Sequence, residues 1–190
     1  RYSITSIGAQ KQTASATLAV SSVNDAPVLD NTASPALTGV SEDLAAPSKA
    51  STANSTLVSA LLTGVSDIDT GAAQGIAIVA SNTSDGTLWF SDDDGASWTA
   101  VDKASDSNAL LLRAEDRVYW QPAANKNGSV SDALTFRAWD QSDSVGAEGT
   151  YVDATKNGGS TEFSTATDTV SATVSAVNDA PTLTVSTKAL

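Results

Sequence analysis

The 190-residue chain contains no cysteine and no histidine. Without cysteine there are no disulfides, no thiolate nucleophiles and no metal sites built on sulfur. Without histidine there is no Ser-His-Asp triad, so carboxylates and carbonyl oxygens are the main ligands left for a metal. A disulfide-free extracellular protein needs another source of rigidity, and bound metal is the usual substitute.

Basic residues and long apolar runs are also scarce. Ten Lys and Arg stand against 22 Asp and Glu, a net charge of -12. Nucleic acid is therefore an unsuitable partner, because its phosphates would be repelled. No apolar run approaches the roughly 20 residues that span a bilayer, so we expect no membrane insertion. No signal-peptide pattern opens the chain, and we expect a segment of a longer protein.

The acidic residues are mostly aspartate: 18 Asp against four Glu. Glutamate suits helix surfaces, whereas aspartate suits turns and tight oxygen cages for hard cations. This skew predicts loops that hold Ca²⁺ as a cofactor. The alternative is an acidic surface that serves only solubility.

Helical periodicity is nearly absent, and short apolar runs alternate with clusters of Gly, Asn, Asp and Ser. This pattern is typical of an all-β fold, here an antiparallel Ig-like or cadherin-like β-sandwich with long functional loops and at most one short helix. The helical turn is expected at Thr56–Leu62. The predicted strands are Ser15–Val23, Gln74–Ser81, Gly86–Ser91, Trp98–Val101, Ala109–Arg113, Arg117–Trp120, Ala133–Trp139 and Asp168–Ala176.

The pentapeptide Val-Asn-Asp-Ala-Pro occurs twice, at Val23–Pro27 and at Val177–Pro181. Each copy follows a predicted strand, which the proline ends because it removes a backbone donor and restricts the residue before it. The copies predict stiff joints. Residues 24–177 are then an extended β-sandwich domain. Residues 1–23 are terminal strands of a preceding unit or a strand that this domain borrows, and 178–190 are a linker and the start of the next unit.

The joints, with Ser41-Glu42-Asp43 and Asp67-Ile68-Asp69 after the first, resemble the junctions of cadherin-like and Ig-like tandem repeats in giant bacterial RTX adhesins. In such arrays these acidic groups bind Ca²⁺ between successive domains. The resemblance implies an extracellular location on a bacterial cell surface, a role in adhesion and biofilm formation, and neighbouring domains of the same adhesin as partners. The implied metal ligands at the joints are Asp25, Glu42, Asp67, Asp69 and Asp179.

A plain sandwich takes roughly 100 residues, but the two joints lie 154 positions apart, which leaves room for long binding loops. The first candidate loop is Ser91–Trp98, "SDDDGASW". It predicts a Ca²⁺ site that uses Asp92 and Asp94; the alternative is a solvated hairpin tip.

The second candidate loop is Trp139–Ser164, which combines acidic residues with four glycines. Glycine lets backbone carbonyls approach a ligand. Asp140 and Asp143, with carbonyl oxygens, are expected to complete a site of 6–8 oxygens for Ca²⁺. The alternative is a flexible loop without a ligand.

Strand alternation puts Arg137 and Trp139 on the outer face, and it puts Arg117 with Tyr119 on one face of the predicted strand Arg117–Trp120. An aromatic ring beside a cation and a bound Ca²⁺ is a good receptor for a carboxylate or a sugar. The alternative is that these aromatic residues pack under a neighbouring loop.

The segment from Leu110 through "LTFRAWDQS" to "NGGSTEFSTATDT" resembles the ligand-binding modules of large RTX adhesins. The resemblance implies a Ca²⁺-dependent grip on a peptide, the C-terminal end of a partner protein. Its implied metal ligands are Asp140, Asp143 and Asp153. The predicted ligand-binding residues are Trp139, Tyr151, Tyr119, Arg137 and Asn157.

Three functions therefore compete. The first is a Ca²⁺-dependent adhesion module that binds a peptide or a glycan. The second is a Ca²⁺-stiffened structural extender. The third is an enzyme, of which only a carboxylate-pair glycosidase survives the missing His and Cys. The acids cluster beside Gly and Asn, as metal ligands do, so we expect no enzyme.

Overall fold

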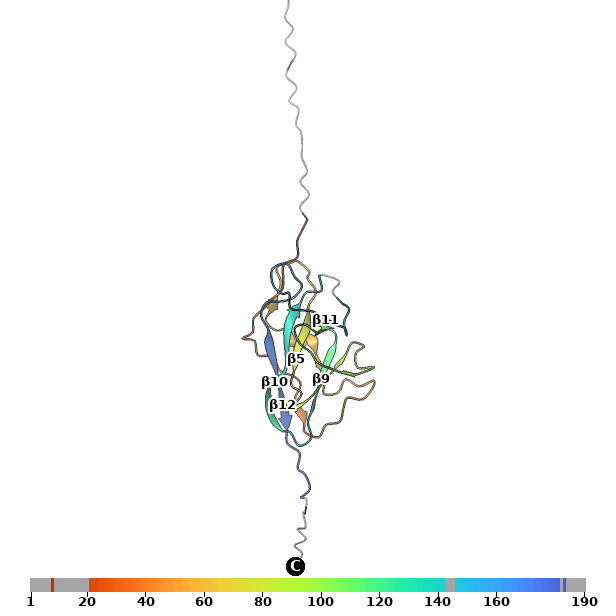
Figure 1. Ribbon diagram of the computed structural model, residues 1–190. Helices are drawn as coiled ribbons and strands as arrows, with labels where there is room; N and C mark the ends of the chain where they lie inside the picture. Colours follow the sequence, from red (N-terminus) through yellow and green to blue (C-terminus); the bar gives the residue numbers. More distant parts are fainter. Residues whose placement is uncertain (1–7, 9–20, 143–145, 182, 184–190) are drawn as a thin grey trace, which may run out of the picture.

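The computed structural model describes residues 8, 21–142, 146–181 and 183. Two β-sheets pack against each other, and the chain arrives at one end of the sandwich and leaves at the opposite end (Figure 1). The elements are β1 (Val28–Leu29), β2 (Val40–Ser41), β3 (Thr56–Leu57), η1 (Val58–Leu61), β4 (Val65–Ser66), β5 (Gly75–Ser81), β6 (Gly86–Ser91), β7 (Thr99–Ala100), β8 (Ala109–Arg113), β9 (Arg117–Pro122), β10 (Gly128–Trp139), β11 (Tyr151–Val152) and β12 (Asp168–Ser175).

The larger sheet has the order β11-β8-β5-β10-β12-β2, and the smaller one has the order β3-β9-β6-β7. A separate pair joins β1 to β4. The predicted all-β sandwich is confirmed. One detail is corrected: β2 pairs with β12 in parallel, because the chain after the first joint runs along β12 in the same direction.

Most predicted strands are confirmed, and Gly86–Ser91 and Ala109–Arg113 have the predicted bounds. The predicted helical turn is a short 3₁₀ helix, η1. Strand β10 begins five residues before its prediction, and its pairing register with β12 shifts between Val130 and Leu134. Most of the predicted strand at Ser15–Val23 lies outside the described residues, and its last three residues are not in a strand.

The main hydrophobic core lies between the two sheets. The inward face of β10 contributes Leu134, Phe136 and Ala138, all with no exposed surface. Trp120 of β9 is 1% exposed and fills the core from the smaller sheet. This is the face that the alternation of apolar residues predicted.

A second, smaller core covers the outer face of the larger sheet. We call residues 146–166, which connect β10 to β12 and contain β11, the outer segment. Its Ala154 and Phe163 are fully buried against Trp139, which is only 2% exposed. Trp139 and Phe163 also form an antiparallel bridge. The prediction that Trp139 points into solvent is wrong, and the alternative of packing under a neighbouring loop is confirmed.

Arg137 is also buried, at 9% exposed, and its predicted outward, accessible position is wrong. Its guanidinium lies 2.8 Å from an Asp106 carboxylate oxygen and donates to the carbonyls of Ser164 and Thr165 at 3.1 and 2.6 Å. A buried charge needs such partners. Arg137 therefore holds the outer segment on the sheet.

No helix long and apolar enough to cross a membrane occurs in the part of the chain that the structure describes.

The second core leads to a stability prediction. Phe163 is the largest side chain that the outer segment contributes to the second core. Replacing it by Ala leaves a cavity beside Trp139. We expect a loss of about 3–5 kcal/mol in unfolding free energy, measured by urea denaturation. Leu57→Ala, at a site 37% exposed, is the control and should cost much less. A loss below about 1 kcal/mol for Phe163→Ala would contradict the second core.

Candidate functional site

The first joint is docked at one end of the sandwich, which we call the entry pole: residues 22–25 with loops 67–73 and 140–142. Asn24 donates from Nδ2 to Asp140 Oδ2 at 2.9 Å and to the Thr161 carbonyl at 3.1 Å. The backbone N–H of Asp25 donates to Asp69 Oδ2 at 2.8 Å. Two carboxylates from distant loops therefore meet at two consecutive residues of the joint.

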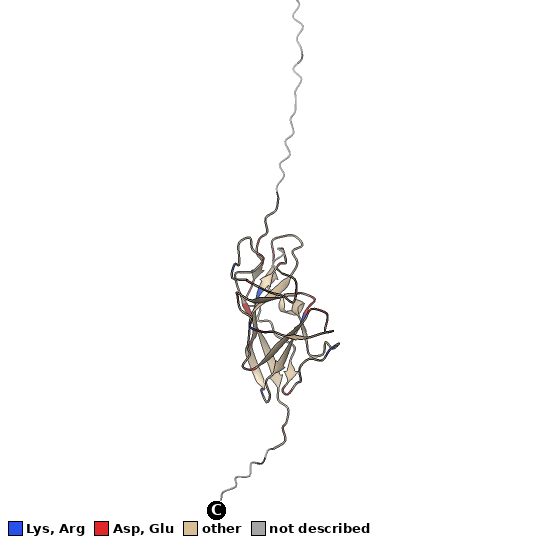
Figure 2. Cartoon of the chain, turned by 45° about the vertical axis from the view of Figure 1, so that its right-hand side comes forward, with Lys and Arg blue, Asp and Glu red and all other residues tan. Residues whose placement is uncertain are grey.

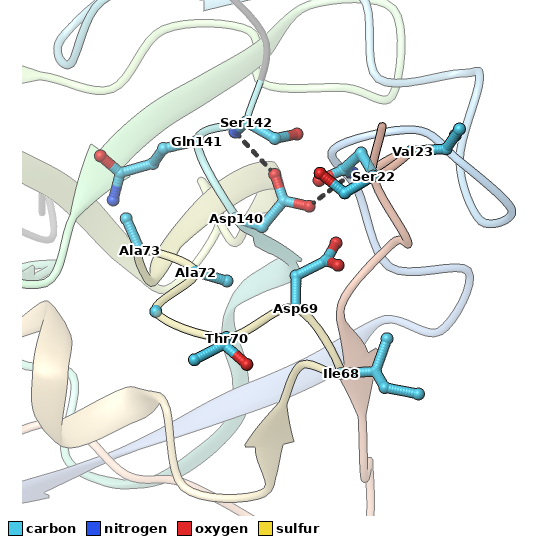
Figure 3. Close-up of a pocket in the computed structure, with 12 residues that line it drawn as sticks. Ser22, Val23, Ile68, Asp69, Thr70, Ala72, Ala73, Asp140, Gln141 and Ser142 are labelled. Atoms are coloured by element: carbon cyan, nitrogen blue, oxygen red, sulfur yellow. Dashed lines mark hydrogen bonds between the residues drawn. The ribbon is translucent and has the colours of Figure 1, made fainter. Parts of the chain in front are cut away.

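A hollow of about 720 Å³ lies beside these contacts, lined by residues 22–24, 68–73 and 140–142. In Figure 3 the carboxylates of Asp69 and Asp140 lie on the side where the chain passes through Ser22 and Val23. Ile68 is 82% exposed at the rim. The entry pole is thus an open hollow with two carboxylates beside it and an exposed apolar residue at its rim.

The backbone after β10 fixes the position of Asp140. Its N–H donates to the Glu162 carbonyl at 3.1 Å, so the end of the outer segment extends the sheet next to it. Its Oδ1 accepts from the Ser142 N–H at 2.8 Å, and the side chain is 3% exposed. Asp143, the other predicted ligand of this loop, lies outside the described residues.

Asp67 has a buried carboxylate oxygen at the entry pole. Its Oδ1 accepts from the Asp69 N–H at 2.8 Å, while its Oδ2 is buried and has no hydrogen-bond partner among the described residues. A buried carboxylate oxygen without a partner is costly. A hard cation with oxygen ligands would satisfy it.

Within residues 21–142 and 146–181, no three acidic side chains converge in a metal-binding arrangement. Ca²⁺ takes 6–8 oxygens. Asp67, Asp69 and Asp140 lie around the entry pole without forming such a group.

The second joint lies at the opposite end, which we call the exit pole: Glu42, residues 125–127 and residues 176–179. Glu42 is 4% exposed and accepts from the Val177 N–H at 2.6 Å and from Asn127 Nδ2 at 2.8 Å. The Asn127 amide, and then the Val177 N–H, lower the pKa of Glu42. Asp179 is exposed.

Several aspartates have a structural use that does not involve metal. Asp30, Asp67, Asp140 and Asp153 each accept from the backbone N–H two residues further on, at 3.0, 2.8, 2.8 and 2.9 Å. This is the Asx-turn, which aspartate stabilises in loops. The many loops between the strands of the described residues need such turns, so turn formation accounts for part of the aspartate excess.

The acidic hairpin Ser91–Trp98 has the arrangement of a solvated tip. Asp94 forms an ion pair with Arg117 at 2.6 Å, while Asp92 is exposed and faces Gly149 of the outer segment. The middle residue, Asp93, was not among the predicted sites. Hydrogen bonds from the Ser97 hydroxyl and N–H, and from the Ser91 hydroxyl, lower its pKa to about 2.

The remaining predicted ligand-binding residues have partners inside the fold. Tyr119 is 3% exposed, donates to the Ala45 carbonyl at 2.8 Å and contacts Trp98 edge-on at 5.9 Å, so it packs inside the fold. The half-buried Tyr151 hydroxyl accepts from the Asp102 N–H at 3.0 Å. Asn157 caps carbonyls of its own loop.

Asp153 belongs to the same outer segment as Tyr151 and Asn157. It is exposed, and the Thr155 hydroxyl and N–H lower its pKa. These contacts give it a role in the local turn.

Sequence reasoning missed Asp116, in the turn between β8 and β9. It is 3% exposed, and burial raises the pKa of its carboxyl to about 6, aided by Glu115, Asp92 and Glu148 and opposed by a hydrogen bond from the Arg113 N–H. No pattern in the sequence distinguishes it from the exposed aspartates.

Figure 2 shows acidic and basic residues in short separate stretches of the chain rather than in one continuous band. Comparisons with models of protein families, with curated proteins and with solved structures found no match for this chain.

The raised pKa of Asp116 predicts a pH-dependent stability. A carboxyl with a raised folded-state pKa is destabilising once the pH rises through about 4 to 6. Asp116→Asn should therefore stabilise the fold at pH 7 by about 1–2 kcal/mol, because it removes a buried charge. The gain should disappear near pH 4, as followed by urea denaturation across this range.

Asp153→Asn is the control of opposite sign, since the pKa of Asp153 is lowered. It should weaken the fold at neutral pH, and its effect should fade as the pH falls through the folded-state pKa. A gain for Asp116→Asn that does not change with pH would contradict the buried-charge explanation.

Proposed function

We propose that the chain is a module of an extracellular tandem array whose joints are stiffened by Ca²⁺, and that its main role is to extend the array. One observation carries this proposal. The first copy of the repeated pentapeptide is hydrogen-bonded to Asp69 and Asp140 at the entry pole, and the second begins at Glu42 at the opposite pole. An acidic side chain therefore lies at each end of the sandwich, where a neighbouring module of the array would be joined.

The donor chemistry favours Ca²⁺ over a transition metal. Every side-chain ligand on offer is a hard oxygen, and the chain has no thiolate or imidazole. Asp67, Asp69 and Asp140 with oxygens of the joint would hold the ion at the entry pole, where Asp67 Oδ2 lacks a partner among the described residues. Bound there, Ca²⁺ would neutralise these carboxylates and add its binding free energy to the folded state.

The ligand-binding alternative receives less support. The predicted ligand-binding site included Trp139, Arg137 and Tyr119, and all three are at least nine-tenths buried. The outer segment that was to grip a peptide is packed on the sheet through Phe163. The extra length of the chain is therefore accounted for by a second core.

The metal proposal predicts a calcium-dependent melting temperature. Extracellular Ca²⁺ modules have dissociation constants of about 10⁻⁴–10⁻³ M, so several millimolar Ca²⁺ should add about 1–2 kcal/mol over a chelated sample. Asp69→Asn and Asp140→Asn should each reduce this gain, because the amide keeps the acceptor but loses the charge. Calorimetry in Ca²⁺ and in EDTA measures it.

Asp102→Asn is the matched control, because Asp102 is exposed and distant in sequence from both joints. It should leave the calcium gain unchanged. Equal melting temperatures in Ca²⁺ and EDTA for the unchanged protein would refute the metal-stiffened joint.

Peptide and glycan arrays distinguish the extender from the adhesion module. For an extender we expect no Ca²⁺-dependent binder on either array, although calorimetry still detects the ion. A peptide or glycan that binds in Ca²⁺ and is released by EDTA would reverse the preference.

A further inference from the structure

Asn127 is the exposed residue directly before β10 at the exit pole, and Gly128 is the exposed first residue of that strand, paired with Val174 of β12. Gly128 has a φ of +101°, and nothing lies within 4 Å of the position that a Cβ would occupy. The Asn127 amide nitrogen donates to Glu42 Oε2 at 2.8 Å, and the other Glu42 oxygen accepts from Val177, the first residue of the second joint. A neutral amide thus supports the carboxylate that holds this joint.

An asparagine followed by glycine is chemically labile, because no side chain hinders the next backbone nitrogen. The Gly128 nitrogen can attack Cγ of Asn127, forming a new C–N bond in a five-membered succinimide. The Cγ–Nδ2 bond breaks, and the amide leaves as ammonia with the proton from the Gly128 N–H. Water then opens the ring at either carbonyl to give aspartate or isoaspartate, so no other reactant is needed.

We propose that Asn127 is a site of spontaneous deamidation that converts the amide beneath the second joint into a carboxylate facing Glu42. The reaction stands on the local geometry alone. Its effect on the joint rests on the proposed function, in which acidic groups at the poles await Ca²⁺.

A second Asn-Gly pair in the same chain provides an internal comparison. Asn157 donates to two carbonyls of its own loop, and the Gly158 N–H donates to the Phe163 carbonyl at 2.8 Å. A Cβ on Gly158 would collide with Thr165 Oγ1. The surroundings of Gly158 are crowded, whereas those of Gly128 are open, so the Asn157 pair should react more slowly.

Deamidation at Asn127 removes the hydrogen bond that its amide donates to Glu42. The donor to Glu42 becomes an acceptor, and two carboxylates then lie within hydrogen-bond reach. Such a pair cannot remain doubly ionised without a cost, unless a proton or a cation lies between them. The modified chain should therefore hold the second joint more weakly in the absence of Ca²⁺, and depend more on the ion.

The rate is tested by keeping the full chain in a mildly alkaline buffer and mapping its peptides by mass spectrometry over time. Asn127 should convert several-fold faster than Asn157, giving both aspartate and isoaspartate. Asn127→Gln keeps an amide but disfavours the five-membered ring, and should show no conversion at this position. Equal rates at the two pairs, or an intact Asn127, would overturn the proposal.

The consequence is tested with Asn127→Asp, compared with Asn157→Asp as the matched control. Asn127→Asp should melt at a lower temperature than the unchanged chain in EDTA, with the difference narrowing in Ca²⁺. If Asn127→Asp melts at a lower temperature by the same amount in EDTA and in Ca²⁺, the effect of the modification on the joint is supported. The same result would count against the proposed metal-stiffened joint. An unchanged melting temperature in EDTA would refute the effect on the joint.

Discussion

The structure depends on the burial of strand β10 on both of its faces. Leu134 and Phe136 pack between the sheets, and Trp139 on the other face is covered by the outer segment. A sheet with one apolar face needs one partner layer, whereas a sheet with apolar groups on both faces needs two. The long connection between β10 and β12 supplies the second layer, so some of its residues must be apolar in order to pack on the sheet.

Burying the outer face also requires partners for the charge of Arg137. Arg137 lies between the apolar sheet and the outer segment, where an unpaired cation would be costly. Asp106 neutralises it, and two carbonyls of the outer segment accept hydrogen bonds from its Nη1. Because those carbonyls directly follow Phe163, the same segment that covers Trp139 also satisfies Arg137. The hydrogen bond from the Asp140 N–H to the Glu162 carbonyl continues the contact between β10 and the outer segment. It places the Asp140 carboxylate at the entry pole.

The sequence predicted the bounds of β6 and β8 well, because β6 alternates between buried and less buried residues and β8 is a short continuous apolar run that ends at a charged residue. Strands of two residues, such as β1 and β11, have no measurable period and exist only through their partners. Alternation also assigned Trp139 to the correct face but gave no information on what covers it. The aspartates were harder still, because an Asx-turn and a cation ligand use the same residue type in the same loops.

The repeated pentapeptide shows how far a local sequence determines its own structure. In the first copy, Asn24 and Ala26 are held by Asp140 and by the Gly159 carbonyl, both more than a hundred residues further along the chain. In the second copy, Asn178 has only its neighbour Asp179 as a described hydrogen-bond partner. Identical residues therefore have different contacts, and proline alone, which both contain, cannot make a joint rigid. The contacts of the first copy come from acceptors that the following fold presents, which are the carboxylates of Asp69 and Asp140 and the carbonyls of Gly159 and Thr161.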